Sequence, residues 1–166
     1  LIIKSMKISL IIPVKDDFND FIKTFKTILM QTLLPDEIII IDSSTSDNIK
    51  KYIETMDKKI SIIYKRFNFA LPGKARNLGI LNSKYDYIAF LDSKTIPNQN
   101  WLKDSAHKLK NEGFDVCFGK TKFRYKNFFQ KLLRAASYGS ILHITTPGTI
   151  LKKNIFSQNL NFFIEN

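Results

Sequence analysis

The sequence predicts an α/β fold built on a mainly parallel sheet, and three observations support this prediction. Short apolar runs recur at 7–14, 38–41 and 87–91, and runs of this kind are typical of strands buried on both faces of a sheet. Segments of helical length separate the runs, and the first one, after Asp17, carries an amphipathic stripe. The run 87–91 stops abruptly at a carboxylate, Asp92. Strands and helices that alternate in this way favour a parallel sheet with right-handed crossovers.

The chain as far as Asp92 is predicted to contain four strands and three helices. The loop 43–47 is rich in serine and aspartate, which often cap helices, so Asp47 is interpreted as a helix cap rather than a ligand. Pro72 and the glycine after it introduce the third helix. In order we expect strand 7–14, a helix capped by Asp16 or Asp17, strand 38–41, a helix after 47, strand 60–64, a helix from about 74 to 82, and strand 87–91.

Beyond Thr95 the pattern is less regular, and the predicted elements are shorter or more exposed. A helix capped by Asn100 is expected to end at Gly113. A strand over 116–123 alternates lysines with apolar residues, and an amphipathic helix follows. The remaining predicted elements are this helix at 127–138, a short strand at 149–151 and the start of a helix at 154–156.

Length, charge and cysteine content limit the classes of protein to consider. At 166 residues the chain fits one domain with its own core. The formal net charge of +11 favours anionic partners such as nucleotide diphosphates, nucleic acid or an anionic membrane, although a solvated lysine-rich surface also explains it. The single Cys117 excludes an internal disulfide and fits a reducing compartment. No apolar run is as long as a transmembrane helix, so we predict a cytoplasmic location, with the inner face of the membrane as a further possibility.

Carboxylates follow the predicted strands at one edge of the sheet, which is where open α/β sheets bind ligands. The loops 14–16, 42–44 and 92–94 would meet there, and their acids suit ribose hydroxyls, a base N–H or a divalent metal ion. Lys74 and Arg76 lie in the first turns of a predicted helix, where backbone N–H groups attract anions. Together these features predict a nucleotide diphosphate site. The sequence has no GxGxxG motif, Walker lysine motif, paired cysteines or histidine-rich cluster that would indicate other common sites.

Four segments in this order resemble the family 2 inverting glycosyltransferases, which have the GT-A fold. The segment 8–14 (Ile-Ser-Leu-Ile-Ile-Pro-Val) resembles their first strand, and 41–47 is similar to their signature at the second strand. The segment 73–79 (Gly-Lys-Ala-Arg-Asn-Leu-Gly) resembles their Gly-x-Ala-Arg-Asn-x-Gly motif, and 90–92 resembles the strand that leads into their Asp-x-Asp motif. The resemblance covers about 7–101 and implies a GT-A three-layer α/β/α fold.

The resemblance also implies roles for individual residues in binding a nucleotide sugar. Pro13 and Val14 would border the base, and Asp42 would bind the base edge or the ribose. Arg76 would lie near the base or the phosphates, and Asp92 near the ribose and a Mg²⁺ or Mn²⁺ ion. The chain would then be one GT-A domain over 1–166, with the nucleotide-binding half at 7–101 and an incomplete acceptor-side half at 102–166.

Lys94 departs from the family motif, because it stands where the family has the second metal-binding acid. A protonated lysine cannot ligate a divalent ion. Three interpretations remain open: Asp92 alone holds the metal with waters and phosphates, the ammonium replaces part of the ion's charge, or activity is lost. We hypothesise the second, in which Lys94 joins the donor-binding residues.

The catalytic base is the second departure. Inverting transfer needs a carboxylate to take the proton of the acceptor hydroxyl, and the family carries it in a Glu-Asp segment. Glu165 is the only acid in the corresponding window, and Asn166 follows it. Either these two residues are an altered form of the segment or the chain stops just short of it. We prefer the second interpretation, which leaves the catalytic residues unassigned.

Three function classes follow from these observations. The preferred hypothesis is a glycosyltransferase that moves a sugar from a nucleotide-diphosphate donor onto a glycan or lipid-linked acceptor with inversion. The alternatives are a GT-A-like domain that binds nucleotide sugar without catalysis and a basic nucleic-acid-binding module. The last would show basic residues interleaved with exposed aromatics, whereas most phenylalanines here fall on predicted core stripes, so no nucleic-acid partner is expected. The basic amphipathic segment 126–138 could rest on an anionic membrane.

Overall fold

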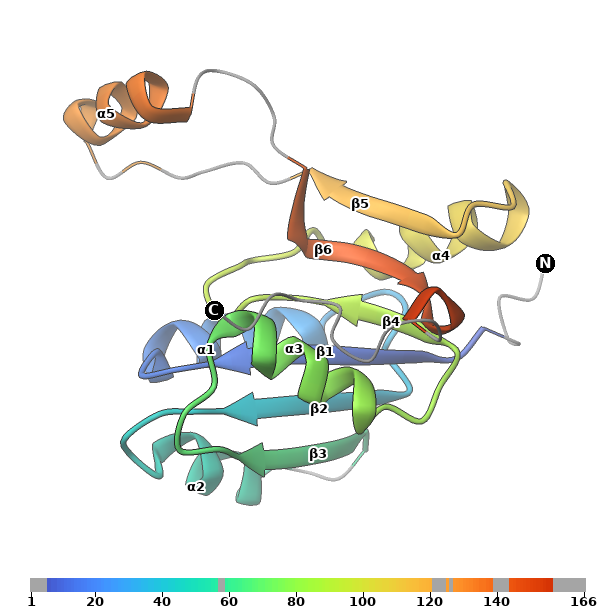
Figure 1. Cartoon of the computed structure of the whole chain (residues 1–166), viewed down its shortest axis with the longest axis horizontal. Coiled ribbons are helices and arrows are strands. Elements are labelled where there is room, and N and C mark those ends of the chain that lie inside the picture. The colour runs from blue at the N-terminus through green and yellow to red at the C-terminus, as the bar shows by residue number, and fades with distance from the viewer. Residues whose placement is uncertain (1–5, 57–58, 121–124, 126, 139–143, 157–166) are drawn as a thin grey trace.

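A six-stranded mixed sheet forms the centre of the computed structural model (Figure 1), which describes residues 6–56, 59–120, 125, 127–138 and 144–156. The strand order within these residues is β3-β2-β1-β4-β6-β5. The first four strands run parallel: β1 (Ile8–Val14), β2 (Glu37–Asp42), β3 (Ser61–Arg66) and β4 (Tyr87–Phe90). Val14 pairs with Asp42 in the register of β1 and β2, so the carboxyl ends of these strands meet at one edge. The predicted mainly parallel α/β sheet is therefore confirmed.

The other two strands form an antiparallel extension that the sequence predicted only in part. β6 (Ile144–Lys152) runs antiparallel to both β4 and β5 (Val116–Lys120). The predicted strand 149–151 was too short, because β6 begins five residues earlier and runs through a Pro-Gly pair. Proline and glycine normally interrupt strands, but here pairing with β5 holds the early part of β6 in place. The predicted strand 116–123 ends at Lys120, and 121–123 lie outside the described residues.

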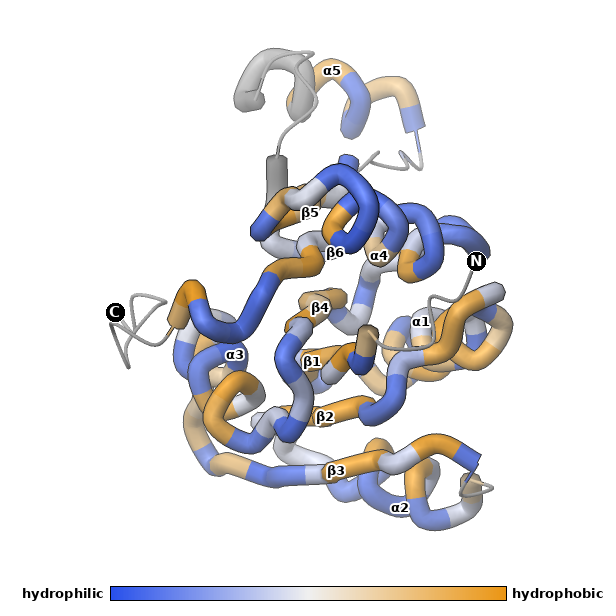
Figure 2. The backbone as a smooth tube through the Cα atoms, turned by 90° about the vertical axis from the view of Figure 1, so that its right-hand side faces the viewer, coloured by the Kyte–Doolittle hydropathy of each residue, from blue (hydrophilic) through white to orange (hydrophobic). Residues whose placement is uncertain are grey.

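Helices cover both faces of the sheet and complete three layers. One apolar cluster joins a face of the sheet to α1 (Phe18–Leu29), α2 (Asn48–Glu54) and α4 (Trp101–Asn111). A second cluster joins the opposite face to α3 (Pro72–Leu81) and the short 3₁₀ helix η1 (Lys153–Phe156). β1 and β2 are buried at every position, and Figure 2 shows that their residues are mostly hydrophobic. α5 (Phe128–Tyr138) stands apart from these layers (Figure 1).

α3 begins two residues earlier than predicted and packs closely on the sheet. Pro72 occupies its first turn, where the missing N–H costs no helical hydrogen bond. Gly79 faces β1, and a Cβ at this position would collide with Cγ2 of Ile11. The close spacing between helix and sheet therefore depends on glycine here, and it fixes the start of α3 beside the edge where the strands end.

Three side chains that were predicted to cap helices bind elsewhere. Asp17, Asp47 and Asn100 occupy the N-cap positions of α1, α2 and α4, but none makes a side-chain capping hydrogen bond. Asp47 forms an ion pair with Arg66 at the end of β3, and Asn100 Oδ1 accepts a hydrogen bond from Thr32 Oγ1 at 2.9 Å. The capping rule located the helix starts correctly, but the side chains bond to residues in other elements of the fold.

Candidate functional site

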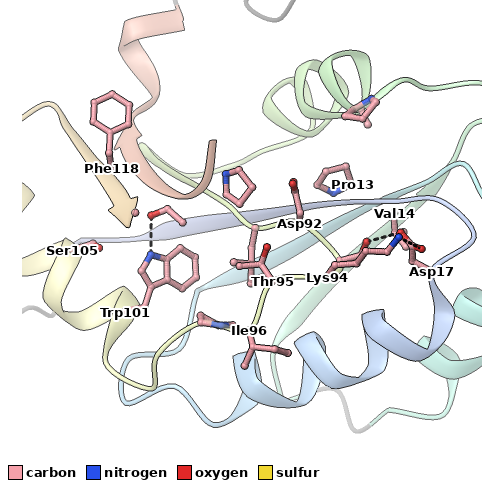
Figure 3. Close-up of a pocket in the computed structure, with 18 of the residues that line it drawn as sticks. Pro13, Val14, Asp17, Asp92, Lys94, Thr95, Ile96, Trp101, Ser105 and Phe118 are labelled. Atoms are coloured by element: carbon pink, nitrogen blue, oxygen red, sulfur yellow. Dashed lines mark hydrogen bonds and ion pairs between the residues drawn. The ribbon is translucent and has the colours of Figure 1, made fainter. Parts of the chain in front are cut away.

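A cleft of about 1490 Å³ opens at the edge where the parallel strands end (Figure 3). Its floor and one wall come from the loops after β1 and β4 and from the start of α3. Its other wall comes from the first turns of α4 and from the facing segments of β5 and β6. The volume exceeds the roughly 300–1,000 Å³ of a pocket for one small ligand, so two substrates can lie side by side in it.

The end of β1 supplies one border of the cleft and is held by polar contacts. Pro13 and Val14 line the cleft, and their predicted contact with a base stays a prediction. Asp16, at φ 53°, accepts hydrogen bonds at Oδ1 from the backbone N of Thr45 (2.8 Å) and from Thr45 Oγ1 (2.9 Å). These bonds hold the pKa of Asp16 below its ordinary value. Asp16 thereby ties the loop after β1 to the loop after β2 and does not cap a helix.

Asp42 lies behind the cleft wall rather than on it. The residue is fully buried, and both carboxylate oxygens are engaged: Oδ1 accepts from the backbone N of Ser44 at 2.8 Å and Oδ2 from the Tyr64 hydroxyl at 2.7 Å. Burial, followed by this hydrogen bond, raises the pKa of Tyr64, so the hydroxyl remains a donor. The next residue, Ser43, reaches the cleft wall. The predicted contact of Asp42 with a nucleotide stays a prediction.

α3 and the loop after β4 meet at an ion pair. Arg76 Nη2 lies 2.6 Å from Asp92 Oδ1, and the Arg76 side chain is only 11% exposed. Asp92 lines the cleft and is 38% exposed, so one carboxylate oxygen can face a ligand while the other binds the guanidinium. Lys74 is exposed on the same helix but lies outside the cleft lining. The structure therefore brings Arg76 and Asp92 together and leaves Lys74 outside the cleft lining, and the predicted contacts of these residues with a nucleotide stay predictions.

Lys94 forms an ion pair with Asp17, a residue that the sequence predicted only as a helix cap. Its Nζ lies 2.7 Å from Asp17 Oδ1, and this hydrogen bond raises the pKa of Lys94 above its ordinary value. The Ser93 hydroxyl donates to the other oxygen of Asp17 at 3.3 Å. Figure 3 shows this pair on one side of Asp92, below Val14. Lys94 is therefore an oriented ammonium at the cleft, fully protonated at neutral pH.

The side chains at this edge do not fit a divalent metal ion. Among the described residues, no group of three histidine, cysteine or acidic side chains could hold a metal. A metal ion would be expected beside Asp92 and residue 94. The two carboxylates there each already bind a cation: Asp92 binds Arg76, and Asp17 binds Lys94. Because Mg²⁺ and Mn²⁺ need oxygen ligands with excess negative charge, this balanced set is a poor site for them.

The opposite wall of the cleft is aromatic and rests on a close contact between β5 and β6. Trp101 Nε1 donates to the carbonyl oxygen of Gly148 at 2.9 Å, which fixes the indole against β6. Gly119 and Gly148 approach so closely that a Cβ at Gly119 would lie 2.8 Å from the Gly148 backbone. Phe118, 55% exposed, and Cys117 complete this wall. Figure 3 places Trp101 and Phe118 on the side of Asp92 away from Lys94.

Sequence reasoning found four residues of the cleft lining and missed its second wall. Pro13, Val14, Asp92 and Lys94 all line the cleft. The role of Asp17 was missed because a helix start was a sufficient local explanation for it. Three other missed residues contribute from separate elements: Tyr64, Trp101 and Phe118. The single tryptophan of the chain, directly after a predicted loop, was the one signal that could have indicated this wall.

Comparisons with known proteins agree with this architecture. The family model described as "Glycosyl transferase family 2" matches residues 9–165. An uncharacterized glycosyltransferase of Rickettsia conorii is 31% identical over 178 residues, which cover 96% of this chain and 29% of that protein. The chain thus spans less than a third of that relative's length.

Two solved structures share the fold at low sequence identity. S. aureus TarS 1–349 in complex with UDP-GlcNAc superposes with a TM-score of 0.70 at 22% identity, covering 93% of this chain and 47% of TarS. The mannosyltransferase PcManGT of Pyrobaculum calidifontis, in complex with GDP-Man and Mn²⁺, gives a TM-score of 0.68 at 15% identity and covers 94% of this chain and 47% of its own. The predicted GT-A fold is confirmed by these likenesses.

Proposed function

We propose that this chain, which belongs to Glycosyl transferase family 2, transfers a sugar from a nucleotide-diphosphate donor to a glycan or lipid-linked acceptor with inversion. The observation that carries the proposal is the two-walled cleft at the carboxyl edge of the parallel strands, lined by Asp92, which Arg76 binds from behind. Open α/β sheets bind ligands at this edge. One wall suits a nucleotide and the other suits a sugar acceptor.

The donor would occupy the wall formed by the loops after β1 and β4. Pro13 and Val14 give an apolar border for the base, and the exposed oxygen of Asp92 can accept a ribose hydroxyl. Arg76 and Lys94 provide positive charge for the phosphates. The nucleotide sugars in the complexes of TarS and PcManGT, UDP-GlcNAc and GDP-Man, support this donor class.

The acceptor would lie against Trp101 and Phe118, whose flat apolar faces suit the apolar face of a sugar ring. In the transfer step an acceptor hydroxyl oxygen bonds to the anomeric carbon, and the bond from that carbon to the donor diphosphate breaks with its electron pair. The hydroxyl proton passes to a carboxylate base. Glu165, the base considered from the sequence, lies outside the described residues. Attack from the side opposite the leaving diphosphate gives inversion.

A lipid-linked acceptor would bring the chain to a membrane surface, and α5 suits that contact. Phe128, Phe129, Leu132 and Leu133 are all more than half exposed on this helix. None of the helices in the described part of the chain combines the length and apolar composition needed to cross a membrane. We therefore propose peripheral binding at the inner face of the membrane, with apolar side chains in the headgroup region and the +11 net charge attracting anionic lipid.

Vesicle sedimentation tests the membrane contact. Wild type is expected to sediment with vesicles that contain phosphatidylserine and to remain in the supernatant with neutral phosphatidylcholine vesicles. The double variant Phe129→Ser/Leu132→Ser should lose this binding. Equal sedimentation of the variant and wild type would contradict the role of α5.

A thermal-shift panel of nucleoside diphosphates, each with and without Mn²⁺, tests the donor proposal. We expect one base to raise the melting temperature, because a ligand that binds only the folded state stabilises it. Arg76→Met should reduce the shift, since it removes the cation beside Asp92. Absence of any shift across the panel would overturn the proposal.

A non-catalytic nucleotide-sugar-binding domain is the second candidate, and Lys94 is the observation that favours it, because a lysine stands in place of the second motif acid. The two candidates differ in turnover. Release of nucleoside diphosphate from a nucleotide sugar in the presence of an acceptor glycan would exclude the binding domain. Binding without release, measured on the same preparation, would favour it.

A further inference from the structure

The positive charge of the cleft comes from its own side chains. They lie where relatives with an Asp-x-Asp motif would be expected to hold a metal ion. Four lysines and three aspartates line the cleft, and Arg76 approaches from behind Asp92. If residue 94 were an acid, the group of Asp17, Asp92, residue 94 and Arg76 would be strongly negative. With lysine there, the same group is neutral, and the remaining cleft lysines leave the cleft positive overall.

Two contacts fix Lys94 to α1 and its N-cap residue, one at the side-chain ammonium and one at the backbone just before it. The Nζ of Lys94 binds Asp17 at the start of that helix. One residue earlier, the carbonyl oxygen of Ser93 accepts a 2.8 Å hydrogen bond from Thr24, which is fully buried on the same helix. Both the backbone before Lys94 and the end of its side chain are thus fixed to one rigid element. An ammonium oriented in advance loses less conformational freedom when a ligand binds.

The ammonium is also available to a ligand. The Lys94 side chain is 62% exposed and lines the cleft on the same loop as Asp92. A protonated lysine has three N–H donors, and Asp17 accepts one of them. Two donors and the positive charge can therefore face the anionic oxygens of a ligand in the cleft.

We infer that Lys94, positioned by Asp17, takes the place of the divalent ion at the donor diphosphate, so that this chain binds nucleoside diphosphate without metal. The inference rests on the proposed function, because it assigns the phosphate contact of that same donor site. Lys94 would contact the diphosphate directly. Asp17 would act through Lys94, as a positioning residue.

Calorimetric titration of the whole chain with UDP and GDP, in EDTA and in Mn²⁺, tests the metal independence. We expect whichever diphosphate binds to do so with equal affinity under the two conditions. Binding that appears only with Mn²⁺ would overturn this inference while leaving the proposed function intact. Failure of both diphosphates to bind under either condition would overturn the proposed function as well.

Lys94→Met tests the assigned contact. Charge-assisted hydrogen bonds of this kind support an expected loss of roughly 10- to 100-fold in affinity for the diphosphate. Affinity for the matching nucleoside, which has no phosphate, should not change. The matched control is Lys23→Met, because Lys23 is also ion-paired on α1, through Asp20 at 3.0 Å, but lies outside the cleft lining. Equal losses in both variants would show a general charge effect and contradict the contact.

Lys94→Asp gives the sharpest test, because it places a second acid two residues after Asp92. This variant should bind the diphosphate weakly in EDTA and regain affinity with Mn²⁺, which reverses the metal response of wild type. Lys94→Arg should keep most of the metal-independent affinity. The Lys94→Asp variant could instead show the same diphosphate affinity with and without Mn²⁺ while its circular dichroism matches wild type. That result would contradict the proposed exchange of lysine for metal.

A double-mutant cycle separates positioning by Asp17 from a structural role. Asp17→Asn alone should weaken diphosphate binding, because it frees the ammonium. In the Lys94→Met background the same substitution should have no further effect, since the group that it positions is gone. Additive losses would assign Asp17 to the structure of the loop and remove it from the proposal.

Discussion

The parallel region of the molecule and its antiparallel region differ in how deeply their residues are buried. In the parallel region, β1 to β4 with α1, α2 and α3, every residue of β1 and β2 is buried between two helical layers. In the antiparallel region, β5, β6 and α5, exposed and half-buried residues alternate along β5, and α5 exposes its apolar residues. The cleft lies between the two regions, so one wall comes from loops at the edge of the buried sheet, whereas Phe118 of the other wall is 55% exposed.

Under the proposed function, this difference would separate donor binding from acceptor binding. The proposed donor site has to align the base, the ribose and the phosphates at once, and a rigid sheet edge holds its binding residues in one geometry. The proposed acceptor wall includes exposed side chains such as Phe118, and such positions can change without loss of the fold. The comparison therefore predicts that the two regions respond differently to the same chemical change, and the following experiments test that prediction.

The largest expected difference comes from removing one phenylalanine ring in each region. Phe25 on α1 is fully buried, so Phe25→Ala should lower the free energy of unfolding by about 3–5 kcal/mol. Phe118 on β5 is 55% exposed, and Phe118→Ala should change that free energy by less than about 0.5 kcal/mol. Urea denaturation followed by circular dichroism measures both.

Similar losses in the two variants would show that the antiparallel region is as tightly packed as the parallel one. If Phe25→Ala does not fold, Phe25→Leu provides a milder form of the same test. The slope of unfolding free energy against urea should stay constant, because a change in slope would indicate a change in the unfolded state rather than a lost core contact.

The glycine contact between β5 and β6 is the place where the antiparallel region does depend on close packing. Gly119→Ala would put a Cβ 2.8 Å from the backbone of Gly148, and backbone atoms cannot move aside as a side-chain end can. We expect a loss of about 3 kcal/mol, at the upper end for overpacked sites. Gly113→Ala is the control, because nothing lies within 4 Å of its Cβ although its φ is +74°; left-handed backbone alone costs about 1 kcal/mol. Equal losses in urea denaturation would contradict the contact.

The same contrast explains how much of the molecule the sequence could predict. β1, β2 and β4 are apolar over most of their length, so local pattern and tertiary role agree for these strands. β6 instead passes through Pro147 and Gly148, and only its pairing with two neighbours makes this segment a strand. Local rules contain no term for such pairing. The fold class was therefore predictable, whereas the length of β6 was not.

The residues of the candidate site likewise divide into those that the sequence could predict and those that it could not. Asp92 was predictable because it directly follows a buried strand. The Asp17–Lys94 pair was not, because the two residues lie 77 positions apart and a helix cap was a sufficient local account of Asp17. The Tyr64 hydroxyl on Asp42 was missed for a related reason, since one strand's register against its neighbour decides which side chains meet.

A smaller effect is expected from Tyr64→Phe, which removes a hydroxyl donor from the buried carboxylate of Asp42. Hydrogen bonds to charged groups support an expected loss of about 1.5 kcal/mol in the free energy of unfolding. Because the pKa of Tyr64 is raised in the folded state, its stabilisation is fully present below about pH 10 and is lost as the pH rises above that value. Urea denaturation at pH 8 and pH 11 should therefore show the difference between wild type and variant shrinking at the higher pH. A constant difference would contradict the raised pKa.

The smallest expected effect concerns the loops at the border of the cleft, where Asp16 accepts two hydrogen bonds from Thr45. Thr45→Val removes the hydroxyl donor and keeps the backbone donor, so the pKa of Asp16 should rise part of the way toward its ordinary value. Because the folded-state pKa is lowered, the stabilisation is present above about pH 4 and is lost as the pH falls through that lowered pKa. Carboxyl NMR titration measures the shift, and Thr55→Val is the control, because its hydroxyl bonds to Tyr52 on α2. An unchanged pKa in Thr45→Val would mean that the backbone bond alone fixes the loop, and the border of the cleft would then depend on the parallel sheet without help from side chains.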